Sequence, residues 1–463
     1  MSPSPFSLRG LLIGVALCLA IGLLAPWGIV FNYYWIGFNP SSPAALFLLF
    51  VLTFVLNGIA GLVSRHFELG NADLVLIYCM LLMAVTVPTW GLMFFLIGTL
   101  VYPFYYATPE NNYAELFYDS IPGWMVPADM EAITDYYEGL PQGAAIPWSV
   151  WFEPMAYWLA LIVVMGFMLI CMSAILHRQW SGHERLAYPM SQLPQSMIER
   201  GPDPRTRLAP FFKNRWTWLG FALSFVLLSL NACNHYFPFV PQYNPYGQVQ
   251  LFDWNLHLPI QLNLAWVGFF YLVNLEITFS IWFFYVLSKI QEGVFNILGI
   301  ASTERLSAYE YSQPADVTHQ ATGAVIVLVV FGLWTARRHL AEVGRKLWHP
   351  NQGVDDSEEL LRYRTALLGF LVSLLFVGAW LWRSGVPLAV LPVLLAVSLI
   401  FFILVARVVA AAGVATARSP IVPAYFIISG MGTSILGSKG LVALNFTFIW
   451  QGESRTSPMV ACA

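Results

Sequence analysis

Apolar runs of membrane-spanning length recur along this chain and limit what it can fold into. A helix needs about 20 mostly apolar residues to cross the hydrocarbon core of a bilayer, and only helices or closed barrels satisfy their backbone polar groups there. Hydrophobic residues make up 58% of the chain and charged residues 10%, whereas soluble domains carry about 25% charged residues. We therefore predict an all-α, polytopic helical bundle embedded in the membrane.

We expect about nine to ten membrane segments, some of them broken helices. The expected segments are residues 11–31, 43–63, 72–107, 153–176, 216–240, 262–287, 321–335, 365–382, 388–406 and 421–450. The run 72–107 contains Pro88, Trp90 and Gly91, which predict a break, and discontinuous helices often build the sites of transporters. The alternative is a proline kink within one tilted span. Glycines at 430–440 predict a second break, in the last run.

The run 262–287 carries Asn274 and Glu276 near its centre. A carboxylate at that depth costs roughly 2.5 kcal/mol or more on insertion, so it normally faces a cavity or a partner inside the protein. We interpret Glu276 as part of a polar path, where it exchanges a proton or binds a cation; the alternative is a hydrogen-bonded contact between helices. Asn231 and His235, at the outer end of run 216–240, are further candidates for this path.

The distribution of basic residues predicts which loops face the cytoplasm. The chain has no Lys or Arg between His66 and His177, and its polar part at 108–147 is acidic, whereas the loop 177–215 is basic. Cytoplasmic loops carry the excess of Lys and Arg. We therefore expect an external loop 108–147, an internal loop 177–215 and a cytoplasmic N-terminus.

The topology between residues 289 and 340 does not follow directly from this rule. We expect the Glu276 helix to reach the cytoplasm at Lys289, and a single crossing by 321–335 would then place Arg337 and Arg338 outside. Because this conflicts with the charge rule, we expect either a re-entrant segment at 321–335 or a second membrane-entering piece within 294–302.

Two parts of the chain share the same order of sequence features. Residues 9–105 and 364–450 each have an Arg, an apolar run, a turn with proline, a second run ending in Arg, and a broken apolar run. Transporters are often built from such repeats, although any two membrane hairpins look alike at this level. We predict a first repeat at 1–335, a charged cytoplasmic linker at 336–364 and a partial, truncated second repeat at 365–463.

The sequence ILHRQWSGHERLAYPM, which opens the basic loop, contains a basic pair, a charged residue, Leu, an aromatic residue and Pro. It resembles an element of the oligopeptide transporter family, and the positions that carry it are Arg178, Glu184, Arg185, Leu186, Tyr188 and Pro189. More closely, RGLLIG, PFYYATPEN, YEGLP, ARRHL and RTSPM resemble a bacterial membrane family labelled peptide-transporter-like. The resemblance implies a transporter-like protein of the bacterial inner membrane, with a chain that continues past RTSPM.

These observations favour a secondary transporter for a small organic solute or a peptide, with the proton as candidate coupling ion. No Walker A motif is present, so ATP is not expected to drive this chain directly. The alternatives are a non-transporting membrane scaffold subunit, a truncated inactive transporter fragment, and a membrane-embedded enzyme that uses His177, His183 and Glu184.

The sequence predicts few other ligands. The five cysteines form no CxxC pair, and no spacing indicates catalytic residues, a metal site or a cofactor. A net charge of −3 gives no reason to expect nucleic acid. The expected partners are the lipid bilayer, the substrate, protons and, in a homo-oligomer, further copies of the chain.

Overall fold

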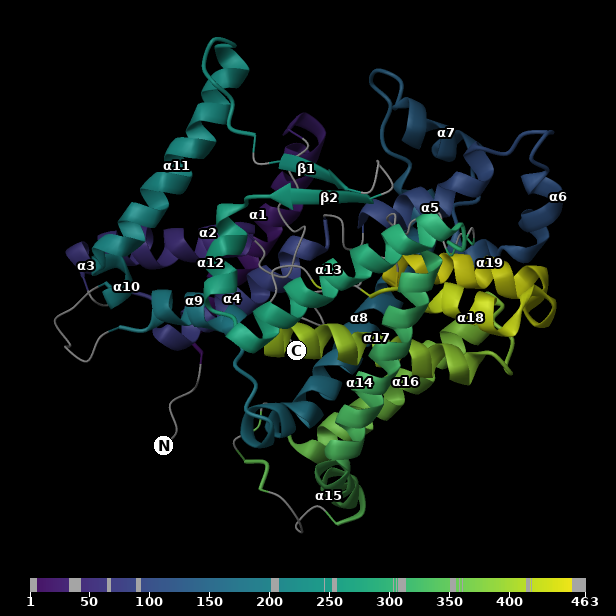
Figure 1. Ribbon diagram of the computed structural model, residues 1–463. Coiled ribbons are helices and arrows are strands. Elements are labelled where there is room, and N and C mark those ends of the chain that lie inside the picture. The colour runs from purple at the N-terminus through teal and green to yellow at the C-terminus, as the bar shows by residue number, and fades with distance from the viewer. Residues whose placement is uncertain are drawn as a thin grey trace. The chain divides into compact units, whose positions relative to one another are not determined.

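The computed structural model (Figure 1) shows an almost entirely helical chain. It describes residues 6–32, 43–64, 68–88, 93–200, 208–244, 246–251, 256–302, 304, 306, 314–349, 355–357, 359, 361–413, 417 and 419–451. In this part of the chain the strands form one antiparallel hairpin, β1 (Tyr246–Leu251) with β2 (Leu256–Gln261). The predicted all-α, polytopic class is confirmed.

Contacts divide the chain into two compact units, and each is interleaved in sequence. The first comprises residues 1–85, 187–303 and 408–416. Its helices are α1 (Leu8–Asn32), α2 (Pro43–Phe50), α3 (Asn57–Val63), α4 (Asn71–Thr86), α9 (Pro189–Ile198), α10 (Pro210–Lys213), α11 (Arg215–Tyr236), α12 (Leu264–Tyr271) and α13 (Leu275–Leu298), with a π-helical turn at Val51–Leu56.

The second unit comprises residues 86–186, 304–407 and 417–463. Its helices are α5 (Met93–Tyr105), α6 (Tyr113–Phe117), α7 (Met130–Glu138), α8 (Trp148–Arg178), α14 (Ala315–Thr335), α15 (Arg337–Trp348), α16 (Tyr363–Ser384), α17 (Leu391–Ala412), α18 (Pro423–Met431) and α19 (Thr433–Gln451). Helix α17 continues into the first unit after Arg407. Short 3-10 turns lie at Tyr118–Ser120 and Gly123–Met125.

Seven described helical segments are long and apolar enough to cross a membrane. They are Leu8–Trp27, Ala44–Gly61, Trp148–His183, Arg215–Tyr236, Ala315–Thr335, Tyr363–Ser384 and Leu391–Ala412. The other three expected segments, 72–107, 262–287 and 421–450, are each divided into two shorter helices. The chain is thus suited to a membrane, with both unbroken and broken helices.

The breaks have local causes. Helix α4 ends at Thr86, before Pro88, which cannot donate a backbone hydrogen bond to the preceding turn. Helix α18 ends at Met431, before Gly432, whose φ of 79° favours glycine, and Gly437 (φ 62°) kinks α19. The predicted breaks in these two runs are therefore present.

The run 262–287 was expected to be one continuous helix, and this expectation is wrong. Helix α12 ends at Tyr271 and α13 starts at Leu275, with extended backbone at Asn274 (φ −56°, ψ 137°). Asn favours the position just before a helix, and an acidic residue in the first turn complements the helix dipole. Glu276 therefore lies in the first turn of α13, not near the centre of a span.

The helices between residues 289 and 340 differ in their bounds from the expected segments. Helix α14 begins at Ala315, behind Pro314 and with Asp316 in its first turn, so it is longer than the apolar run 321–335 suggested and suffices for a crossing by itself. Residues 294–298 belong to the end of α13, which Gly299 terminates in a left-handed conformation (φ 68°). A separate membrane-entering piece at 294–302 does not form.

In the second unit, α8 and α16 form an antiparallel pair (Figure 1). Near the start of α8, the Trp158 ring lies 4.8 Å from that of Trp380, late in α16. Towards the end of α8, Cys171 lies against Gly369, in the first half of α16. The two ends of the α8–α16 pair carry different kinds of side chain, and the candidate site lies at one of these ends.

At the N-terminal end of α8 the acidic loop 108–147 folds as an ordered cap. The Trp158 indole N–H donates to the Met125 carbonyl (3.0 Å), and Trp124 packs edge-on against Trp380. Arg383, at the end of α16, lies 5.2 Å from the centre of the Trp124 ring. We call this the aromatic end of the α8–α16 pair, and the opposite end, at His177 and Arg178, the basic end.

The order of elements agrees with the predicted repeat without testing it. Two helical segments followed by a broken pair occur as α1, α2–α3, α4 and α5, and again as α16, α17, α18 and α19. The repeat and its boundaries stay a prediction. The predicted linker 336–364 contains a regular helix, α15.

Candidate functional site

An ion pair at the basic end joins the segment after α8 to α17. Arg407 Nη2 lies 2.5 Å from Glu184 Oε2, and the two side chains are only 22% and 14% exposed. The buried Gln179 side chain donates to the other carboxylate oxygen of Glu184 (3.2 Å). Charge-assisted contacts of this kind are strong where water is limited, and losing one partner leaves the other charge uncompensated.

A glycine on α14 makes room for the Arg407 side chain. A methyl group built on Gly332 would lie 3.2 Å from Arg407 Nη1 and 3.6 Å from Cζ. The guanidinium group therefore passes directly over the backbone of α14. Three membrane-type segments, Trp148–His183, α14 and α17, meet around one pair of opposite charges.

The residues after Glu184 continue along the C-terminal part of α17. The Tyr188 backbone N–H donates to the Ala410 carbonyl (2.9 Å), and Pro189 lies so close to Gly413 that a methyl group there would be 2.4 Å from Pro189 Cβ. Arg185 (φ 53°) and Tyr188 (φ 44°) adopt left-handed conformations that cost free energy for non-glycine residues. Such conformations persist only when surrounding contacts hold them, and they concentrate at functional segments.

A π-helical turn, Gln179–His183, lets the chain leave α8 in this direction. It extends the helix past Arg178, and the Glu184 backbone N–H still donates to the Gln179 carbonyl (2.9 Å). Single π-helical turns are rare and occur often at functional sites. Here the turn brings Gln179 and Glu184 together.

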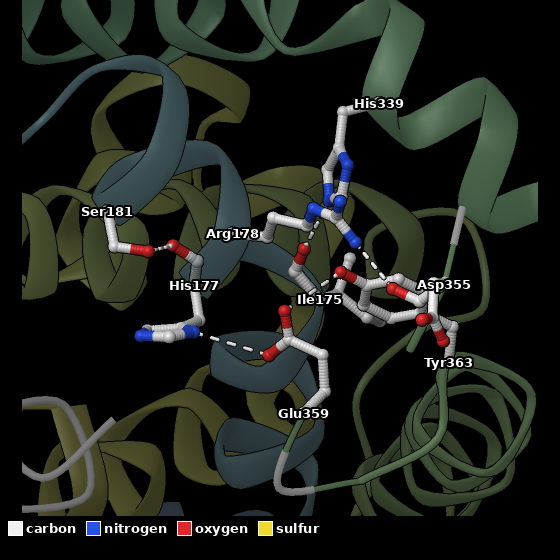
Figure 2. Close-up of polar contacts among 8 residues, drawn as sticks. All are labelled: Ile175, His177, Arg178, Ser181, His339, Asp355, Glu359 and Tyr363. Carbon is white, nitrogen blue, oxygen red and sulfur yellow. Dashed lines mark hydrogen bonds and ion pairs between the residues drawn. The ribbon is translucent and has the colours of Figure 1, made fainter. Parts of the chain in front are cut away.

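A second polar cluster surrounds the end of α8 (Figure 2). His177 Nδ1 lies 3.2 Å from Glu359 Oε2, and the Tyr363 hydroxyl donates to Glu359 Oε1 (3.2 Å). Arg178 donates to the Asp355 carbonyl, and the buried His339 ring lies 2.8 Å from the Ile175 carbonyl. These contacts fasten residues 355–363 and α15 to the end of α8.

An internal salt bridge stabilises the start of α16. Lys346 Nζ lies 2.5 Å from Asp356 Oδ1, and the Tyr363 backbone N–H donates to Asp356 Oδ2 (2.9 Å). Burial raises the pKa of Asp356, but the hydrogen bonds from Lys346 and from Tyr363 outweigh it, so the pKa lies below its usual value of 3.8. The carboxylate is thus ionised and paired at neutral pH.

Comparison with known proteins gives one assignment. A model described as a family of unknown function, DUF6785, matches residues 2–462. The chain belongs to this family. No curated protein and no solved structure matches it. Membership of DUF6785 carries no link to oligopeptide transporters, so that resemblance stays an expectation.

In this DUF6785 chain the residues of the predicted cytoplasmic motif make different contacts, and these contacts do not join them into one site. Arg178 binds the 355–363 segment, Glu184 binds Arg407, and Tyr188 and Pro189 lie along α17. The Arg185 side chain is exposed. In the described residues no group of three or more His, Cys, Asp or Glu side chains is arranged to hold a metal ion.

The residues of the predicted polar path at Glu276 have different surroundings from those expected. The Glu276 and Asn274 side chains are exposed on this chain, whereas the sequence predicts that Glu276 faces the protein interior; its role in a polar path stays a prediction. The physical reason is the break before Leu275, which puts both residues at a helix start, where polar groups are favourable. The hydroxyls of Thr278 and Ser280 donate to the backbone carbonyls of Asn274 and Glu276.

The remaining predicted path residues do not gather around Glu276 in any contact that the described structure contains. Asn231 accepts from the Tyr243 backbone N–H (2.8 Å) and donates to its carbonyl (3.1 Å), so it fixes the turn after α11. His235 is exposed beside Tyr236. Pro88 is half-buried in the turn that follows α4, and Trp90 and Gly91 lie outside the described residues.

Sequence reasoning missed Arg407 and Gly332. The sequence pattern places Arg407 at the end of a span, yet it lies five residues before the end of α17. An arginine inside an apolar helix, together with an unpaired carboxylate elsewhere, is a signal for an internal ion pair. The sequence could have suggested such a pair, but it could not identify Glu184 as the partner.

Proposed function

We propose that this protein is an integral membrane secondary transporter for a small organic solute or a peptide, with the proton as coupling ion. We further propose that Glu184, paired with Arg407, carries the proton, in place of Glu276. The observation that supports this is the Glu184–Arg407 pair, which is largely shielded from water among three membrane-type segments.

The chemistry of the Glu184–Arg407 pair suits the coupling of proton movement to substrate binding. Ionisable groups inside membrane bundles are costly, so they pair with each other and mark ion or substrate pathways. When Glu184 takes up a proton, its attraction for Arg407 falls and the guanidinium group becomes available to an anionic group of a substrate, such as a carboxylate. When the proton leaves, Glu184 recaptures Arg407 and the substrate is released. Each step transfers one proton to or from the Glu184 carboxylate, and no bond of the substrate is formed or broken.

The test uses the full chain in liposomes that contain an internal pH dye. A mixture of di- and tripeptides, and separately a mixture of small organic acids, is added outside under an inward proton gradient. The proposal predicts solute-dependent acidification of the interior with at least one mixture. A monodisperse, helical preparation that gives no acidification beyond that of protein-free liposomes with either mixture would overturn it.

Matched carboxylate variants make the test specific to the site. Glu184→Gln keeps the size of the side chain and removes its charge change, so we expect the solute-dependent proton flux to fall at least tenfold. Glu276→Gln alters an exposed carboxylate and should leave the flux within about twofold of the wild type, because surface changes away from a site have small effects. The opposite ranking would return the coupling role to Glu276.

A further inference from the structure

Helix α15 has two faces of opposite character. At about 100° per residue, positions 337, 338, 341, 345 and 348 fall within about 100° of one another around the helix. All five side chains on this stripe are exposed: Arg337, Arg338, Ala341, Arg345 and Trp348. We call this stripe the arginine face of α15.

The opposite face holds α15 on the α8–α16 pair. His339 lies against the Ile175 carbonyl of α8, and Lys346 binds Asp356 just before α16. Val343 is buried in an apolar cluster with Cys171 and Ala366. The helix is therefore fixed in rotation, and the direction of the arginine face is determined by packing.

The arginine face makes few contacts within the described part of the protein. No hydrogen bond or ion pair joins the Arg338 or Arg345 side chain to any residue that the structure describes. Arg337 donates to the Trp334 carbonyl (2.8 Å) and lies 4.8 Å from the centre of its ring. The helix has one acidic residue, Glu342, which is half-buried at the edge of the face. Three positive charges are thus presented outwards.

The position of α15 directly after a membrane-type helix favours a membrane surface for this face. Helix α15 begins two residues after Thr335, where α14, a helix long enough to span the bilayer, ends. Trp334 and Trp348 are 65% and 79% exposed, and tryptophan prefers the headgroup level of a bilayer, where its ring is partly apolar and partly wet. Exposed tryptophans on either side of the three arginines therefore suit the headgroup level of a bilayer.

We propose that the arginine face of α15 binds the headgroups of anionic phospholipids. Arginine pairs with phosphate through two parallel hydrogen bonds, and the two tryptophans would enter the headgroup layer on either side. A negatively charged leaflet attracts basic residues near its surface in addition to these contacts. The surface is independent of the Glu184–Arg407 site and of the proposed transport.

The experiment measures lipid preference with the full chain. The protein is placed in nanodiscs of phosphatidylcholine with a minor fraction of phosphatidylglycerol, partly delipidated, and its retained lipids are quantified by mass spectrometry. The wild type should retain phosphatidylglycerol in excess over its share of the disc. The triple variant Arg337→Gln/Arg338→Gln/Arg345→Gln should lose this excess, at about fivefold in relative affinity for each arginine removed.

A charge-conserving variant is the matched control. Arg337→Lys/Arg338→Lys/Arg345→Lys keeps the three positive charges and should keep most of the enrichment. Melting temperatures of all three proteins check the fold, because the substituted side chains lie on the exposed face. Equal enrichment in the wild type and the Gln variant would overturn the proposal. Displacement of the lipid by millimolar inorganic phosphate would also overturn it, since the face would then bind free phosphate and not a membrane surface.

Discussion

The carboxylates Glu276 and Glu184 differ in how far their sequence context predicts their contacts in the folded chain. Glu276 attracts attention because it interrupts an apolar run, but the backbone break at Asn274 places it in the first turn of a helix. Glu184 lies in a polar loop sequence, yet it binds Arg407 from a distant part of the chain. A linear window shows composition around a residue, whereas burial depends on where the helices break and which segments meet.

The Lys346–Asp356 pair gives a residue-scale prediction with a defined pH dependence. The folded pKa of Asp356 lies below its ordinary value. Its contribution to stability is therefore complete above the ordinary pKa near 4 and is lost as the pH falls through the lower, folded value. We expect Asp356→Asn to lower the melting temperature at pH 7, and the difference from the wild type to shrink below about pH 4.

The double variant Lys346→Gln/Asp356→Asn is the control for this prediction. Lys346 is only 7% exposed, so removal of Asp356 alone leaves a shielded, uncompensated charge, which is costlier than removal of both charges. The double variant should therefore melt above the single one at pH 7. A difference between wild type and Asp356→Asn that is constant from pH 7 to pH 3 would contradict the assignment.

At the scale of elements, the α8–α16 pair depends on a small residue at its contact. A methyl group on Gly369 would lie 2.8 Å from Cys171 Sγ and from Phe167 Cε1. Overpacking of a close contact typically costs about 1–3 kcal/mol. Gly369→Ala should therefore lower the melting temperature in detergent, as followed by circular dichroism.

Gly323 supplies the comparison for this packing effect. It lies in α14, and a methyl group placed on it would meet no described neighbouring atom within 4 Å. Gly323→Ala should be neutral or slightly stabilising, because alanine favours a helix over glycine by about 1 kcal/mol. If Gly369→Ala also leaves the melting temperature unchanged, α8 and α16 pack less closely than the contact at Gly369 implies.

The break between α12 and α13 allows these two helices to enter the membrane separately. The end of α14 adjoins α15, which is fastened to the basic end of α8, so α14 must start on the side of the acidic cap. If the basic end faces the cytoplasm, as the basic loop predicts, we expect Ile300, just after α13, to lie outside and α12 and α13 together to make an even number of crossings. This prediction differs from the expectation that the chain reaches the cytoplasm at Lys289.

Cysteine labelling in intact cells tests this topology, on a background in which the five native cysteines are replaced by serine. Cysteines at Asp129 and Ile300 should both react with a membrane-impermeant reagent. A cysteine at Ser357 should react only after permeabilisation. Reaction of Ile300→Cys together with Ser357→Cys, and apart from Asp129→Cys, would mean that α12 and α13 make one crossing.

At the scale of the whole molecule, the sequence predicts the fold class but not the contacts of the candidate site. The apolar runs predicted the helical membrane bundle, and Pro88 and Gly432 predicted two of the three broken helices. The third break, at Asn274, was missed because the flanking residues are as apolar as those of a continuous span. The Glu184–Arg407 contact was missed because it depends on tertiary packing between segments that share no sequence pattern.

The proposed role of Glu184 is tested most directly by separating proton-driven accumulation from exchange in the same liposomes, with the solute mixture that gives acidification. A carrier whose coupling carboxylate is neutralised can still exchange bound solute across the membrane, but it cannot use a proton gradient. We expect Glu184→Gln to retain counterflow of labelled solute while it loses accumulation against a concentration gradient, with the wild type doing both. Unchanged accumulation by Glu184→Gln, with the same dependence on the proton gradient as the wild type, would contradict the role of Glu184 as the proton carrier.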